Sequence, residues 1–343
     1  MSLLHRIQAW APVPVYPVIG EGAVADIERL RLGPALTFVS SIRHASILLV
    51  AGTIRSGDQP ALRRLHDQLP HPRATLWWRS KPLGEAIDPV REEGDDPVLA
   101  LRSLDRQLRT GECPSEADWL SNVPPNRWQG EGDYGQGGKG MMGGVPYGRP
   151  MAMTDDDQRD GLSLDAMTVR IGPFVPMLPA GLSLELTLQG DVIQRARVLT
   201  PALPAEGHGQ SASLRQAAIL FELLGLDALA ARCFRSPDRR ALCRAARRSG
   251  AFLAIPPDLG IIEKTDVRTR LRDALLGEQP GLPLDAQPLG PMLTGLEWQE
   301  AMLVINSIPV EQLAIIAQPT PCDGGAPRNQ IQRSHHRHHG GHA

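Results

Sequence analysis

The chain has 343 residues, of which 42% are hydrophobic and only 4% aromatic, and its formal net charge is −2. This length allows two or three domains with cores of their own, which must be built mainly from Leu, Ala, Val and Ile. Because the charge is nearly balanced, composition does not favour general binding to nucleic acid or to an acidic membrane surface. No apolar run approaches the roughly 18 residues that span a bilayer, and residues 1–11 do not look like a secretory leader. We therefore expect a cytoplasmic protein.

Four cysteines, Cys113, Cys233, Cys243 and Cys322, are spread widely along the chain. None of them forms a C-x-x-C pair, so the spacing predicts neither a zinc site nor a disulfide framework. Reduced and unrelated thiols are the better interpretation.

Residues 35–110 predict an α/β unit, made of strands over 35–39, 47–51 and 74–78 and helices over 58–68 and 96–109. The apolar runs show no alternation, as in strands that are buried on both faces. The first helix carries Leu62, Leu65 and Leu69 on one side and is ended by Pro70 and Pro72. The order strand, helix, strand predicts a parallel sheet with a right-handed crossover.

Residues 111–161 are rich in glycine and proline and predict a long, shaped loop. The stretch 134–140 superficially looks like a phosphate loop, but Gly140 follows Lys139 where serine or threonine is required, so a nucleotide site is not favoured. Four carboxylates that suit a divalent cation follow at Asp155, Asp156, Asp157 and Asp160. They lack the spacing of a calcium loop, which favours a solvated turn or a helix cap.

The pattern then alternates from Thr168, and Leu182, Leu184, Leu186 and Leu188 point to one side. Gly190-Asp191 predicts the turn of a hairpin that returns over 192–199. Helices are predicted to follow over 213–224, with Ser213 and Gln216 as a capping box, and over 236–249, 265–276, 297–304 and 310–317. The expected organisation is an α/β domain in 1–110, a glycine-rich linking loop in 111–166, a β-hairpin and helical domain in 167–317, and a disordered tail in 318–343.

Residues 43–53, RHASILLVAGT, and residues 60–73, PALRRLHDQLPHPR, carry a specific resemblance. They are similar to the respiratory complex I subunit that holds the terminal 4Fe–4S cluster and to the small subunit of NiFe hydrogenases. In those families a strand reading ADxxxVxGT precedes a helix reading PALRxxYDQMPxPR. The α/β unit is accordingly expected to be a flavodoxin-like parallel sheet.

A second resemblance begins at Ile171-Gly172-Pro173-Phe174-Val175-Pro176 and continues over 181–198. It is similar to the opening of the adjoining large subunit of the same complexes, where Gly-Pro-x-His-Pro precedes a ribbon reading LELxLDGxxVxxA. The stretches 214–226 and 293–304 resemble the helical body of that subunit. Because the two subunits contact each other, a fusion of both is structurally sensible.

The reactive groups of these families are missing. A 4Fe–4S cluster needs about four converging thiolates, and the resemblance places two of them before the first matched strand, where this chain has none. The third position is occupied by Trp77-Trp78-Arg79-Ser80, and Cys113-Pro114 is the single match to a ligand. Val175 replaces the histidine that faces the quinone site. The resemblance thus implies a scaffold without a cofactor, with a 4Fe–4S cluster that uses Cys113 as the alternative.

Two basic segments remain. A dense arginine run, assigned to the second helix, comprises Arg232, Arg235, Arg239, Arg240, Arg244, Arg247 and Arg248. No aromatic residues interleave with it, which favours a solvated or partner-facing side over a nucleic-acid site. The tail contains His335, His336, His338, His339 and His342, a density that binds Ni²⁺, Zn²⁺ or Cu²⁺, with incidental affinity of a disordered tail as the alternative.

Three functions follow as hypotheses. The first is a non-catalytic structural or assembly partner of a complex I-like or membrane-bound hydrogenase-like redox complex. Its partners would be the subunits of that complex, and through them it would sit at the cytoplasmic face of a membrane. The second is an electron-transfer subunit of the NADH:quinone oxidoreductase or hydrogenase type, with atypical or partner-supplied cluster ligands. The third is a metallochaperone that uses the histidine tail.

Overall fold

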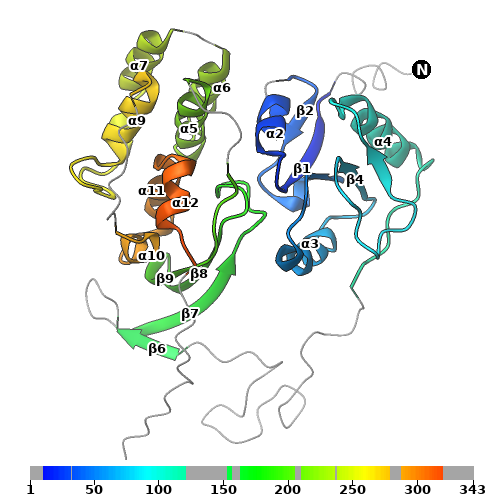
Figure 1. The fold of residues 1–343 in the computed structure, drawn as a ribbon, viewed down its shortest axis with the longest axis horizontal. Coiled ribbons are helices and arrows are strands. Elements are labelled where there is room, and N and C mark those ends of the chain that lie inside the picture. Colours follow the sequence, from blue (N-terminus) through cyan, green and yellow to red (C-terminus); the bar gives the residue numbers. More distant parts are fainter. Residues whose placement is uncertain are drawn as a thin grey trace, which may run out of the picture.

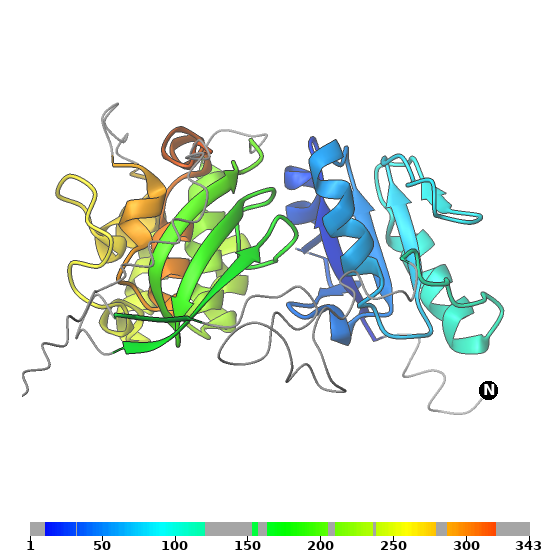
Figure 2. The ribbon, with the colours of Figure 1, turned by 90° about the horizontal axis from the view of Figure 1, so that it is seen from below.

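The computed structural model describes residues 11–31, 33–120, 153–156, 163–204, 210–235, 238–278 and 287–319. They form two bodies that lie side by side (Figures 1 and 2). The first is an α/β domain within residues 11–120, and the second joins an antiparallel sheet to a group of helices.

The first domain is built on a five-stranded parallel sheet with the order β2-β1-β3-β4-β5. Its strands are β1 (Val13–Ile19), β2 (Leu36–Phe38), β3 (Ile47–Ala51), β4 (Ala74–Trp78) and β5 (Val90–Glu92). This order is that of flavodoxin-like folds, so the predicted fold class is confirmed. The predicted bounds of β3 and β4 are correct, and β2 is shorter than expected.

Helices cover both faces of this sheet (Figure 1). They are α2 (Val24–Arg31), α3 (Gln59–His66) and α4 (Val98–Thr110), with short 3-10 helices η1 (Ile42–His44) and η2 (Ser56–Asp58). Residues of β3 alternate between the two faces: Ile47 and Leu49 pack with α2 and α4, whereas Leu48 and Val50 pack with α3. Burial on both sides explains why the sequence of this strand does not alternate.

Strand β1 and helix α2 were not among the predicted elements. Pro14 and Pro17 lie within β1, which is nevertheless a central strand between β2 and β3. Proline donates no hydrogen bond to a sheet, so its presence argues against a central strand. Here burial of Val15 and Val18, both fully inaccessible to solvent, outweighs that loss.

The second domain contains a four-stranded antiparallel sheet with the order β6-β7-β8-β9. Its strands are β6 (Met153–Asp156), β7 (Ser163–Ile171), β8 (Ser183–Gln189) and β9 (Val192–Thr200). The predicted hairpin is β8 and β9, with Gly190 at positive φ in the turn. The glycine-rich stretch predicted to be a loop contains β6, whose backbone groups pair with β7.

Helices pack on this sheet and share one apolar core with it. They are α5 (Gln210–Leu223), α6 (Asp227–Arg235), α7 (Arg239–Arg248), α8 (Ala251–Ala254), α9 (Val267–Leu276), α10 (Leu289–Leu293), α11 (Trp298–Ser307) and α12 (Val310–Ile316). The predicted capping box at Ser213 is wrong, because α5 already begins at Gln210 and the Ser213 hydroxyl accepts a hydrogen bond from Arg239 instead. Within the described ranges no helix is both long and apolar enough to cross a membrane.

Candidate functional site

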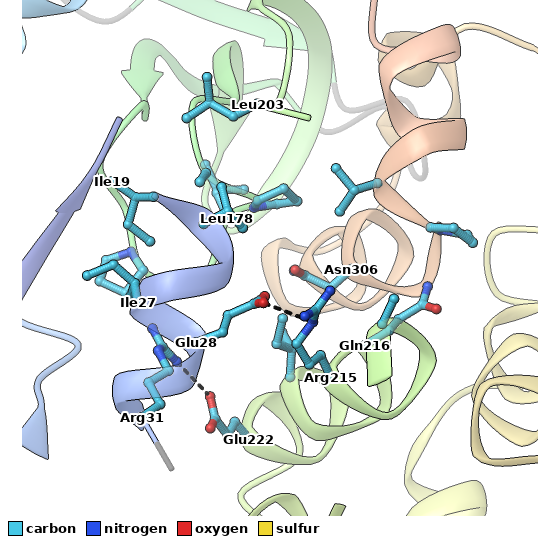
Figure 3. Close-up of a pocket in the computed structure, with 18 of the residues that line it drawn as sticks. Ile19, Ile27, Glu28, Arg31, Leu178, Leu203, Arg215, Gln216, Glu222 and Asn306 are labelled. Carbon is cyan, nitrogen blue, oxygen red and sulfur yellow. Dashed lines mark ion pairs between the residues drawn. The ribbon is translucent and has the colours of Figure 1, made fainter. Parts of the chain in front are cut away.

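The two domains enclose a cavity of about 340 Å³ (Figure 3). Helix α2 lines it from the first domain, and the stretch 176–180, helix α5 and the connection from α11 to α12 line it from the second. Its walls are mainly apolar and include Ile19, Val24, Ile27, Leu178, Leu203, Ile219, Ile308 and Val310. A cavity of this size, with apolar walls and a few polar groups, is typical of small-molecule sites.

Two ion pairs cross the cavity from α2 to α5. Glu28 Oε2 lies 2.9 Å from Arg215 Nε, and Arg31 Nη1 lies 3.7 Å from Glu222 Oε2. Figure 3 shows both pairs as dashed lines. Because each domain contributes one carboxylate and one guanidinium, the two helices are complementary in charge.

The carboxyl groups of these pairs are held in an unfavourable environment. Burial raises the pKa of Glu28, and the charges of Arg215 and Arg31 offset only part of this effect. Burial likewise raises the pKa of Glu222, with Arg31 opposing the shift and Asp227 adding to it. Glu28 Oε2 is buried and accepts no hydrogen bond among the described residues, so its contact with Arg215 is an ion pair without hydrogen-bond alignment. Shifted carboxyl groups in a cavity are candidates for ligand contacts.

A second cavity of about 290 Å³ adjoins the first and shares four lining residues with it: Arg31, Pro176, Ile219 and Glu222. The Arg31–Glu222 pair therefore stands between the two hollows. The Arg31 guanidinium also lies over the Phe38 ring, 5.4 Å from its centroid. Arg31 is thus held by a carboxylate of one domain and an aromatic ring of the other.

Other contacts fix the domains beside the cavity. Tyr16 Oη in β1 donates a hydrogen bond of 2.7 Å to the Phe174 carbonyl, and the Phe174 side chain packs into the core of the first domain. Arg55 Nη1 donates to the Pro201 carbonyl at 3.0 Å. Gly172, at φ +97°, allows the Phe174 segment to turn here, since a Cβ at this position would overlap the Leu182 carbonyl oxygen.

Comparison with protein-family models, with curated proteins and with solved structures found no match to this chain.

Cys113, the single residue matched to a cluster ligand, lies away from the other expected ligand positions. It follows α4, and the adjoining Glu116 N–H donates to the Arg73 carbonyl just before β4 begins. Arg79 and Ser80 follow the opposite end of β4, and a five-residue strand is about 16 Å long. The carboxyl ends of β1, β3 and β4 meet at that edge, and none of the three cysteines in the described ranges lies there.

The remaining described thiols are core residues. Cys233 in α6 and Cys243 in α7 are both buried. Burial raises the pKa of Cys233 to about 12, which keeps its thiol protonated and makes it a poor metal ligand.

The proline-ended motif 60–73 forms a buried polar network that sequence reasoning missed. His66 is fully buried: its Nδ1 lies 2.7 Å from Asp67 Oδ1, and its Nε2 lies 2.9 Å from Glu116 Oε2. Its ring stacks on Trp119 with centroids 3.6 Å apart. Since both ring nitrogens face carboxylates, an imidazolium can donate to both, whereas a neutral ring can donate to one.

In this network, hydrogen bonds together outweigh the effect of burial on the pKa of both carboxyl groups. Burial raises the pKa of Glu116, but hydrogen bonds from His66 and Thr75 outweigh it, and the resulting pKa lies below the ordinary value of 4.5. Burial also raises the pKa of Asp67, but hydrogen bonds from the Trp119 N–H and from His66 outweigh this effect, and the pKa lies below its ordinary value. The motif therefore fastens the segment 113–120 onto the sheet. Two of the partners of His66, Glu116 and Trp119, lie about fifty residues further along the chain, which is why local spacing did not reveal the network.

Several predicted positions fall elsewhere. The histidines of the tail, Cys322, Asp157, Asp160 and the stretch 134–140 lie outside the described residues, while Asp155 and Asp156 belong to β6. Where the chain is described, no group of three or more His, Cys, Asp or Glu residues is placed to hold a metal ion.

The arginine run is split between two helices, because Arg232 and Arg235 belong to α6 and not to the helix that contains the others. Arg239 donates to the carbonyls at the end of α9. Arg240, Arg244, Arg247 and Arg248 are exposed on α7.

Proposed function

We propose that this chain is a non-catalytic structural or assembly partner within a complex I-like or membrane-bound hydrogenase-like redox complex. The contact between Tyr16 and Phe174 carries the proposal. Phe174 belongs to the segment that resembles the opening of the large subunit, and it is buried in the domain that bears the small-subunit motif. A single chain thus holds together two regions that resemble neighbouring subunits.

The edge of the sheet supports the same proposal. Gly20, Gly52 and Arg79 lie where the ends of β1, β3 and β4 meet, and the Gly20 and Gly52 amides are bound to the backbone of the adjacent strands. A cluster at this edge requires thiolates. Gly20 and Gly52 are buried, and Arg79 is paired with Asp26, so this edge fits a structural frame better than a cluster-binding site.

Purification from native membranes tests the proposal. A tagged chain, crosslinked before extraction, is expected to recover subunits of a respiratory or hydrogenase-like complex, quantified by mass spectrometry against an untagged strain. Recovery without any redox subunit contradicts the assembly role.

Iron content distinguishes the electron-transfer alternative from the assembly role. The anaerobically purified chain is expected to contain no stoichiometric iron and to lack visible absorption. Bound iron that disappears in Cys113→Ser but persists in Cys243→Ser, the matched control, would instead establish an electron-transfer subunit.

A further inference from the structure

We propose that the cavity between α2 and α5 binds a small amphipathic molecule, with an apolar body and a neutral or cationic head that donates hydrogen bonds, such as an amine. This site does not depend on the assembly role, because it rests on the shape and polarity of the cavity.

The walls define the body of the ligand. Ile27 approaches from the first domain, while Leu178 and Leu203 approach from the second (Figure 3). Ile219 of α5 also lines the cavity. At about 340 Å³ the cavity has room for a ring with a short chain, and ligands of this kind bury most of their apolar surface in such sites. Since both domains supply wall residues, a bound molecule would contact each of them.

The polar groups define the head of the ligand. Glu28 Oε2 is a buried acceptor that receives no hydrogen bond among the described residues. Asn306 Nδ2 donates to the Met177 and Met302 carbonyls, both at 2.9 Å, so the further hydrogen-bonding capacity of this amide is that of its carbonyl oxygen. Glu28 Oε2 faces Arg215 Nε at 2.9 Å without hydrogen-bond alignment, so this oxygen and the Asn306 carbonyl oxygen both favour a ligand that donates.

The charges around the cavity argue against an acidic ligand. Three carboxylates, of Glu28, Glu222 and Glu311, line it against two guanidinium groups, of Arg31 and Arg215. Both guanidinium groups already face carboxylates. An anion would therefore meet net repulsion, whereas an ammonium group would restore the balance of charge beside Glu28.

The test uses molecules that share one apolar body: phenylbutylamine, phenylbutanol, the acceptor-only ketone phenylbutanone, and phenylbutyrate. Isothermal titration of the full chain at neutral pH is expected to rank the amine first and the alcohol second. The ketone should bind more weakly than the alcohol, and the carboxylate should show no binding. The proposal is overturned if no member binds at millimolar concentration, or if the ketone or the carboxylate binds as tightly as the amine.

Two variants locate the site. Glu28→Gln keeps the shape of the side chain and removes its charge, so affinity for the amine should fall roughly ten-fold or more while affinity for the alcohol changes little. Glu112→Gln, at an exposed position outside the cavity, is the matched control. Ile219→Trp fills the cavity and should abolish binding of every member, with cooperative thermal unfolding as evidence that the variant folds. Unchanged affinity for the amine in Glu28→Gln would place the ligand elsewhere and overturn the assignment.

Discussion

Replacing Arg73 with methionine should release the segment 113–120, which the proline-ended motif 60–73 holds on the sheet. Arg73 is 1% exposed and donates to the carbonyls of His66 at 3.2 Å, Leu69 at 3.1 Å and Glu116 at 3.2 Å. It also forms an ion pair of 2.5 Å with Asp118. Methionine retains most of the apolar stem, so the loss concerns hydrogen bonds and charge.

The magnitude follows from the acceptors that remain. A buried acceptor left without a donor costs about 1–3 kcal/mol, and removing one partner of a buried ion pair costs about 3–5 kcal/mol. Asp118 is 41% exposed and regains water, which reduces its share. We therefore expect Arg73→Met to lower the free energy of unfolding by about 3–5 kcal/mol, and Arg73→Lys, which keeps the charge but has fewer donors, to fall in between.

Urea unfolding, followed by tryptophan fluorescence, measures this loss. Arg109→Met is the matched control, since Arg109 is 46% exposed and pairs with Asp105 within α4, a contact worth only about 0.5 kcal/mol. Limited proteolysis should also show new cleavage within residues 113–120 of the Arg73 variant. If Arg73→Met and Arg109→Met unfold within about 1 kcal/mol of each other, the proposed fastening of this segment is refuted.

Three further outcomes are expected. The pKa of Glu116 is lowered, so the contribution of its carboxylate to stability is present above pH 4.5 and lost as pH falls below that value. The difference in unfolding free energy between wild type and Glu116→Gln should therefore shrink on acidification. Tyr16→Phe leaves the Phe174 carbonyl without a donor and should cost about 1–2 kcal/mol. Because burial raises the pKa of Tyr16 to about 12, the contribution of this hydrogen bond to stability is present below pH 10 and lost towards pH 12. In an ultraviolet titration, the variant should lack the one phenol that ionises at this high pH. In thermal unfolding, Gly172→Ala should destabilise the protein by about 2 kcal/mol or more relative to Gly190→Ala. Gly190→Ala is the control because a Cβ at that position would have open space around it.

The sequence alone determined the elements whose signals are local. The unalternating runs at Ile47–Ala51 and Ala74–Trp78 marked strands buried on both faces, and Gly190-Asp191 marked the hairpin turn. Gly277, predicted to close a helix, ends α9 in the left-handed conformation that glycine adopts readily. In these places the neighbours along the chain fix the backbone, so the pattern is sufficient.

Only the tertiary structure decided where the cavity lies and which ion-pair partners its charged residues have. The proline-bearing strand β1 was not recognised, and the helix that follows it, α2, brings Glu28 and Arg31 to α5. A charged residue on a helix surface has the same local pattern whether it faces water or another domain. Its partner is set by how the two domains pack, because burial and pairing depend on distance in space and not on separation along the chain.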